Sequence, residues 1–127
     1  MEQRLRWRKA ALKDIQRWFH EDDGQVAIYD ATNVERSARQ FLWEFAEKHG
    51  FKLFFIESEC NDPEVVNNTV REVKLHGPDY ISVDKDKAEK DFNERIKKYT
   101  QVYQPMNRDD DSHCSFIKLI DVGKRYF

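Results

Sequence analysis

Three apolar runs, separated by amphipathic segments, constrain the fold of this chain more than any other feature. The runs are VAIY at 26–29, KLFFIE at 52–57 and SFIKLIDV at 115–122. The first is continuous rather than alternating, which is typical of a strand buried on both faces in a parallel sheet. Because helical patterns alternate with these runs, the sequence predicts an α/β fold with a mainly parallel sheet flanked by helices.

Four segments have apolar residues at helical spacing, and they cover about residues 4–20, 32–49, 63–73 and 88–103. Thr32 and Glu35 have the spacing of a capping box at the start of the second segment. Gly50 closes that segment. Asp62 and Pro63 have the pattern of an N-cap followed by a first-turn proline. The run at 26–29, the helical segment at 32–49 and the run at 52–57 have the strand, helix, strand order of a right-handed crossover.

The composition suits one structural unit spanning residues 1–127, since 39% of the residues are hydrophobic and no repeat or linker divides the chain. The 22 Lys and Arg nearly balance the 24 Asp and Glu, so no general field attracts nucleic acid or an anionic membrane. Cys60 and Cys114 lack CxxC spacing, and no apolar stretch has the length of a signal peptide or a membrane span. We therefore expect a reducing compartment such as the cytosol.

A single carboxylate, Asp30, ends the first apolar run. Ligands in open α/β sheets bind beyond the carboxyl ends of the strands, so we expect Asp30 at such a position. An ionised carboxylate there can hold Mg²⁺ or accept the proton of an attacking hydroxyl in phosphoryl transfer. The alternative is an aspartate that only caps or turns the chain, and the pattern alone leaves both open.

Other polar residues add to a candidate anion site. Thr32 and Asn33 lie where a helix begins, and helix N-termini favour anions, although capping by Thr32 explains the same pattern. Cations for a phosphate are available at Arg36, Arg39, Lys74, Arg95 and Lys97. Arginines on amphipathic helices are more often only solvated, and Cys60 is better explained as a small buried side chain than as a reactive thiol. The four histidines have no metal-ligand spacing, so no protein metal cluster is predicted.

A glycine-rich phosphate loop is missing from these 127 residues. Phosphoryl-transfer enzymes of this architecture cradle nucleotide phosphates with G-x-x-x-x-G-K-[ST], and no such stretch occurs here. A phosphoryl-transfer site on this chain is therefore incomplete.

Four long stretches carry a resemblance to a known family: VAIYDATN, GFKLFFIESECNDPEVV, VKLHGPDYI and SFIKLIDVGKRYF. In this order they resemble the kinase domain of the bifunctional 6-phosphofructo-2-kinase/fructose-2,6-bisphosphatase family, from about Arg4 to the C-terminus. The family makes fructose 2,6-bisphosphate, a regulator of glycolysis, from fructose 6-phosphate and ATP with Mg²⁺. The resemblance implies a partial P-loop-kinase-like domain and a cytoplasmic transferase. The ligands that the resemblance implies are fructose 6-phosphate and ATP. A homodimer is compatible with the resemblance.

The resemblance also implies site residues, position by position. Asp30 and Cys60 match catalytic residues of the family. Contacts to fructose 6-phosphate match Arg4, Thr32, Lys74, Arg95 and Tyr99. The stretch that lines the ATP site matches Thr69, Val70, Arg71, Glu72, Val73 and Lys74.

The chain also departs from the family. Ala38 stands where a substrate arginine is expected, and Thr69 and Glu72 replace an asparagine and a glutamine. The chain is further expected to begin after the P-loop strand and to end before the phosphatase domain.

Two hypotheses follow. The first is part of a 6-phosphofructo-2-kinase whose chain alone is inactive, binds fructose 6-phosphate in preference to ATP, and places Lys74 near Arg95. The second is a non-catalytic binding or regulatory module that kept the fold without the P-loop.

Overall fold

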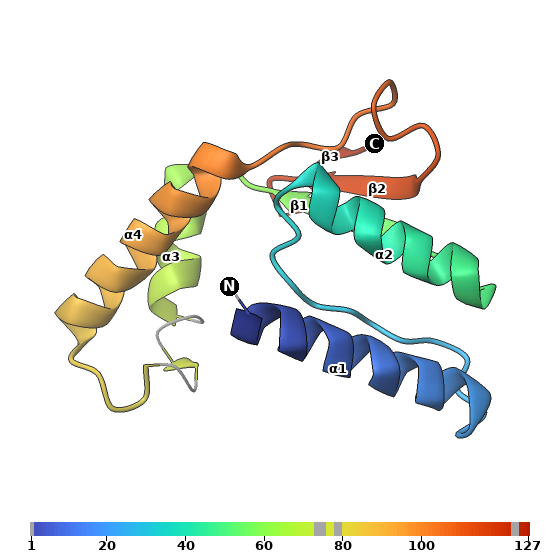
Figure 1. Ribbon diagram of the computed structural model, residues 1–127. Helices are drawn as coiled ribbons and strands as arrows, with labels where there is room; N and C mark the ends of the chain where they lie inside the picture. Colours follow the sequence, from blue (N-terminus) through green and yellow to red (C-terminus); the bar gives the residue numbers. More distant parts are fainter. Residues whose placement is uncertain (1, 73–75, 78–79, 123–124) are drawn as a thin grey trace. The chain divides into compact units, whose positions relative to one another are not determined.

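The computed structural model describes residues 2–72, 76–77, 80–122 and 125–127 (Figure 1). The chain divides into two compact units, Met1–Asn33 and Val34–Phe127. Each unit is described by itself below.

The first unit consists of helix α1 (Glu2–His20) and the segment 21–33. The helix confirms the one predicted over residues 4–20. The chain then turns, and the Gly24 N–H donates to the Trp18 carbonyl at 2.8 Å. The Trp18 indole Nε1–H donates to the Val26 carbonyl at 2.9 Å. Glycine suits this turn because a Cβ on residue 24 would lie 2.1 Å from Trp18 Nε1.

The strand predicted over residues 26–29 is wrong. This segment has no strand pairing in the described part of the chain, and Val26 and Ile28 are 75% and 88% exposed. A strand exists only where a neighbouring backbone takes up its hydrogen bonds, and among the described residues none does so here. Asp30 therefore follows a segment without strand pairing, in which Val26 and Ile28 are exposed, and not a buried strand.

Helix α2 (Arg36–His49) opens the second unit. Leu42 and Ala46, one turn apart, are buried on one face. The helix ends as predicted at Gly50, whose φ of 71° lies in the left-handed region that glycine tolerates. The Gly50 N–H donates to the Glu47 carbonyl at 3.2 Å.

The capping box predicted from Thr32 and Glu35 is also wrong. Glu35 itself is the N-cap, in extended conformation, and its side chain makes no capping hydrogen bond. The Gln104 side chain replaces it, because its Oε1 accepts from the Arg36 N–H at 2.7 Å. The Gln104 N–H in turn donates to the Val34 carbonyl at 2.9 Å, which ties the start of α2 to a distant segment. Thr32 is left exposed.

A three-stranded sheet has the order β1-β2-β3. Strands β1 (Phe54–Glu59) and β2 (Ser115–Ile120) pair in parallel, from Phe54 opposite Ser115 to Glu59 opposite Ile120. The short β3 (Arg125–Tyr126) pairs antiparallel with β2 and was not predicted. The parallel pair confirms the predicted α/β class, although β1 lies two residues later than predicted.

Strand β1 is covered on one face only within the described residues. Phe54 and Ile56, which share one face, are 55% and 63% exposed, whereas Glu57, on the other face, is 9% exposed. Within the described chain this strand, predicted to be buried, is therefore buried on one face and open on the other.

Helices α3 (Pro63–Glu72) and α4 (Lys85–Val102) lie beside each other (Figure 1). Asp62 caps α3 as predicted, since its Oδ1 accepts from the Glu64 N–H at 3.0 Å. Asp84 caps α4 by accepting from the Lys87 N–H at 3.3 Å. Val70 of α3 and Ala88 of α4 are almost fully buried, as their helical spacing predicted.

Candidate functional site

Helices α3 and α4 lie beside each other; α3 carries part of the predicted nucleotide-lining stretch and α4 carries two predicted sugar-phosphate residues. Thr69–Glu72 form the last turn of α3, while Arg95 and Tyr99 lie one turn apart on α4. The ion pair between Arg71 Nη2 and Glu89 Oε1, at 3.1 Å, links the two helices. It is largely exposed, so it contributes little to stability. Val73 and Lys74 lie outside the described residues, and so does the predicted approach of Lys74 to Arg95.

Arg95 is held by a tyrosine that precedes α4. Its Nη1–H donates to the Tyr80 hydroxyl at 3.0 Å, and that hydroxyl donates to Asp91 Oδ2 at 2.6 Å. The Arg95 guanidinium also lies 5.7 Å from the centre of the Phe92 ring. The hydrogen bond to Asp91 and burial raise the pKa of Tyr80, so the phenol stays protonated at neutral pH. We call Tyr80, Asp91, Phe92 and Arg95 the Tyr80 cluster.

Sequence reasoning missed Tyr80 and Asp91. The signal for Asp91 was present, since Asp91 and Arg95 have the four-residue spacing of an acid–base pair on one helix face. No local pattern pointed to Tyr80, because it reaches α4 from the preceding loop.

Cys60 follows the last residue of β1, at the carboxyl end of the strand where ligands of α/β proteins bind. It is half-buried, and its Sγ lies 3.9 Å from the Asp62 carbonyl oxygen, a weak contact within the turn that leads into α3. The position agrees with either reading of Cys60, as a site residue or as a small packed side chain.

Asp30 and Thr32 lie in the first unit, and both are exposed. The backbone of Arg4 belongs to α1 of the same unit. The structure therefore brings Thr69–Glu72, Arg95 and Tyr99 into one unit and leaves Asp30, Thr32 and Arg4 in the other.

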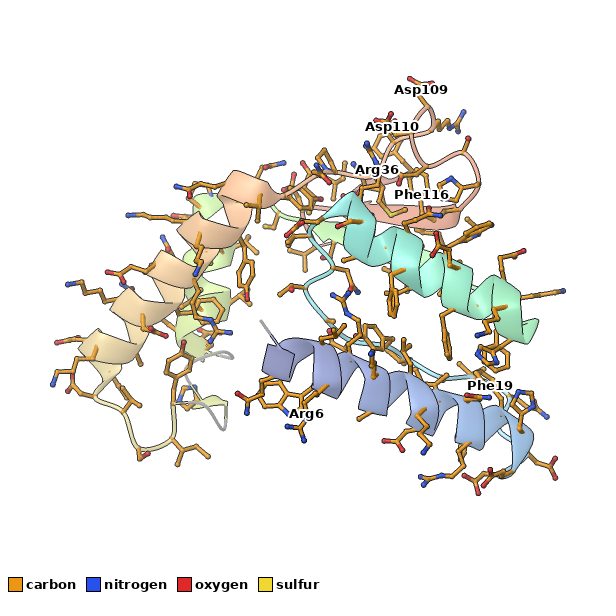
Figure 2. All side chains as sticks on the ribbon, in the orientation of Figure 1. Arg6, Phe19, Arg36, Asp109, Asp110 and Phe116 are labelled. Carbon is orange, nitrogen blue, oxygen red and sulfur yellow. The ribbon has the colours of Figure 1, made fainter. Side chains whose placement is uncertain are left out.

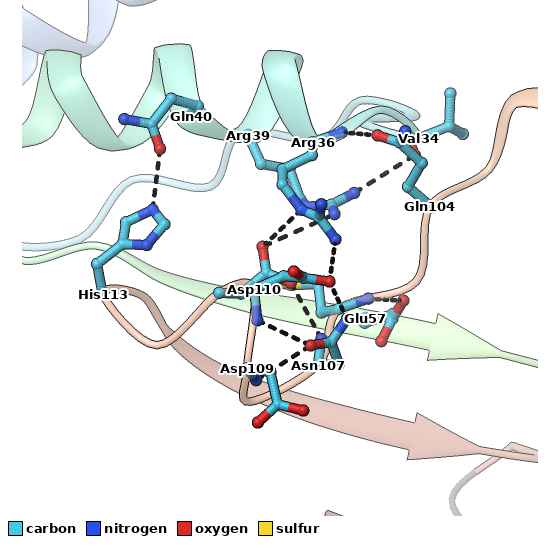
Figure 3. Close-up of polar contacts among 12 residues, drawn as sticks. Val34, Arg36, Arg39, Gln40, Glu57, Gln104, Asn107, Asp109, Asp110 and His113 are labelled. Carbon is cyan, nitrogen blue, oxygen red and sulfur yellow. Dashed lines mark hydrogen bonds and ion pairs between the residues drawn. The ribbon is translucent and has the colours of Figure 1, made fainter.

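The arginines that follow Asp30 in the sequence make ion pairs with the turn before β2 (Figure 3). Figure 2 labels Arg36 and, in that turn, Asp109 and Asp110. Arg36 Nη2 lies 2.7 Å from Asp110 Oδ2, and Arg39 Nη2 lies 3.9 Å from Asp111 Oδ1. Asp111 Oδ2 also accepts from the Asn107 N–H at 3.0 Å. We call these five residues the α2 clamp. Its geometry gives Arg36 and Arg39 a structural role.

Glu57 forms a second buried polar centre, at the middle of β1. The Tyr103 hydroxyl and the Met106 N–H both donate to its Oε1, the latter at 3.0 Å. Lys118 Nζ of β2 lies 2.9 Å from its Oε2. Burial by itself would raise the pKa of Glu57, but the hydrogen bonds from Tyr103, Met106 and Lys118 outweigh it and lower the pKa. Burial and the Glu57 carboxylate raise the pKa of Tyr103 well above its usual range. This centre fixes the segment after α4 on the sheet.

The structure has no group of three or more His, Cys, Asp or Glu side chains placed to hold a metal ion among the residues that it describes, 2–72, 76–77, 80–122 and 125–127. In the same residues no helix is both long enough and apolar enough to cross a membrane.

Comparison with known proteins gives one consistent result. The family model of 6-phosphofructo-2-kinase matches residues 1–127. Over 117 residues, 92% of the chain, it is 49% identical to 6-phosphofructo-2-kinase/fructose-2,6-bisphosphatase 1 of Rattus norvegicus and 50% identical to that of Bos taurus. It is 44% identical to form 4 of Homo sapiens over the same length. The chain spans about a quarter of the length of these relatives, since it covers 25% of each. Because the family model matches the whole chain, the chain belongs to the 6-phosphofructo-2-kinase family.

Proposed function

We propose that this chain is part of a 6-phosphofructo-2-kinase, which transfers the γ-phosphoryl group of ATP to fructose 6-phosphate and forms fructose 2,6-bisphosphate. The observation that carries the proposal is the family match over residues 1–127. In this proposal the chain is a single partial kinase domain of the P-loop class, located in the cytoplasm, with a homodimer as a candidate assembly.

The proposed roles follow the chemistry of the side chains. Asp30 and Cys60 act in catalysis, Asp30 as the carboxylate near the phosphates. The sugar phosphate is bound by Arg4, Thr32, Lys74, Arg95 and Tyr99, whose cations and hydroxyls suit an anionic sugar. The ATP site is lined by the stretch 69–74. The packing of α3 against α4 supports this assignment, because Arg95 and Tyr99 lie in the same unit as Thr69–Glu72.

The residues present suit Mg²⁺ bound through phosphate oxygens. In kinases this ion is held by one or two carboxylates, with substrate phosphates and water completing the octahedron. Asp30 is a single exposed carboxylate of that kind, and no larger protein cluster is needed. The ion supplies neutralisation of the charge that develops on the phosphates. The residues present do not provide the usual cradle for the ATP phosphates, because the 127 residues contain no G-x-x-x-x-G-K-[ST] loop.

A calorimetric titration of the 127-residue chain tests the substrate half of the proposal. We expect heat of binding with fructose 6-phosphate, little with ATP, and none with fructose, which lacks the phosphate that the cations recognise. Binding of ATP without any response to fructose 6-phosphate would contradict the proposal.

One alternative to the kinase is a non-catalytic binding or regulatory module that retains the fold. Production of fructose 2,6-bisphosphate separates the two. The chain should be inactive by itself, because phosphoryl transfer relies on positioning of the phosphates. Activity that appears when an N-terminal segment with a glycine-rich phosphate loop is fused to it supports the kinase. A fused version that folds, binds both substrates and still makes no product supports the module.

A further inference from the structure

Tyr80 is the one buried member of the Tyr80 cluster whose side chain contacts both an acid and a base. It is 7% exposed, whereas Asp91 and Arg95 are exposed. Its ring lies edge-on to Phe92, with 6.2 Å between centroids and 68° between planes. The buried ring therefore fixes where the hydroxyl points, and the hydroxyl meets Asp91 and Arg95 at 2.6 and 3.0 Å.

The Tyr80 hydroxyl donates one of its two hydrogen bonds and accepts the other. A phenol carries one proton, which Tyr80 donates to the Asp91 carboxylate, so its oxygen accepts from the Arg95 guanidinium. The negative charge of Asp91 polarises the hydroxyl and strengthens its acceptance from Arg95. The face of Phe92 provides a second support for the guanidinium at 5.7 Å.

We infer that Tyr80 and Asp91 are positioning residues, which hold the Arg95 guanidinium in the orientation that binds the phosphate of the sugar substrate. The inference rests on the proposed function, since it takes Arg95 as a sugar-phosphate contact. Tyr80 and Asp91 act through Arg95 and do not touch the substrate.

The physical reason is the conformational freedom of arginine. Ordering one rotamer-rich side chain on binding weakens affinity by roughly 2- to 10-fold, so an arginine ordered beforehand binds more tightly by that factor. Arg95 is exposed on α4, and a long arginine side chain at an exposed helix position has several rotamers open to it. The Tyr80 hydroxyl restricts that sampling before the substrate arrives.

The test is calorimetric titration of the 127-residue chain with fructose 6-phosphate. Tyr80→Phe removes the hydroxyl and keeps the buried ring, and Asp91→Asn removes the charge at an exposed position that tolerates change. Each should raise Kd roughly 2- to 10-fold. The control is Asp86→Asn, the same chemical change in the first turn of α4, away from the cluster, and it should leave Kd unchanged.

A double-mutant cycle distinguishes positioning from a general structural role. In an Arg95→Lys background, Tyr80→Phe should have no further effect on Kd, because the guanidinium that it positions is gone. An equal loss in both backgrounds, or no loss from Tyr80→Phe and Asp91→Asn when Arg95→Met abolishes binding, overturns the inference alone. A wild-type chain that binds no better than Arg95→Met overturns the proposed role of Arg95, and the inference fails with it.

Discussion

Removing the charge of Asp111 should destabilise the second unit more than any other single change in the α2 clamp. The Asp111 and Arg39 side chains are 2% and 5% exposed, and their charged atoms lie 3.9 Å apart. Two unit charges at that distance interact by about 4 kcal/mol at an effective dielectric constant of 20. Asp111→Asn keeps an oxygen for the Asn107 N–H but removes the negative charge 3.9 Å from the buried Arg39 guanidinium. We expect a loss of about 3 kcal/mol, at the lower end of the range for breaking a buried ion pair.

The neighbouring Asp110 provides a matched control. It makes the shorter ion pair, 2.7 Å to Arg36 Nη2, yet its side chain is 51% exposed and that of Arg36 is 40% exposed. Water can replace such an interaction, so Asp110→Asn should change stability much less. Urea unfolding followed by circular dichroism measures the loss of unfolding free energy in both variants. In a thermal melt, Asp111→Asn should lower the melting temperature of the second unit by roughly 12–24 °C. If Asp110→Asn costs as much as Asp111→Asn, burial does not decide the strength of these pairs and the reasoning is wrong.

Three further predictions concern single residues. Because folding lowers the pKa of Glu57, its contribution to stability is present above the pKa of an unfolded glutamate and is lost as the pH falls through the folded pKa. Glu57→Gln should therefore be less stable than wild type at neutral pH, and the difference in unfolding free energy should narrow below about pH 4. Gly24→Ala should displace the Trp18 indole and break its hydrogen bond to Val26, which a change in tryptophan fluorescence would report. Asp62→Ala should lower unfolding free energy by about 1 kcal/mol through loss of the α3 cap; an unchanged urea midpoint would contradict it.

Features of the fold set by neighbouring residues could be predicted from the sequence. Gly50 ends α2 because its left-handed φ is a property of one residue, and Asp62 caps α3 through a hydrogen bond to residue 64. The start of α2 could not be predicted in this way, because the side chain of Gln104, far along the chain, accepts the hydrogen bond of the Arg36 N–H. The same limit applies to the candidate site. Arg95 and Tyr99 could be named from resemblance, but the contact from Tyr80 depends on how a loop folds back onto α4.

The three apolar runs show what an apolar run predicts about a strand and what it leaves undetermined. The runs at 52–57 and 115–122 became β1 and β2 because each offers the other a backbone to pair with. The run at 26–29 is as apolar, yet it has no strand pairing among the described residues and its Val26 and Ile28 side chains are exposed. Composition thus indicates that a segment can form a strand, while pairing decides whether it does. Phe54 and Ile56 make the same point within β1, since the residues that identify the strand are those left exposed on its open face. Burial on both faces needs a second layer, and a run of apolar residues cannot specify that layer by itself.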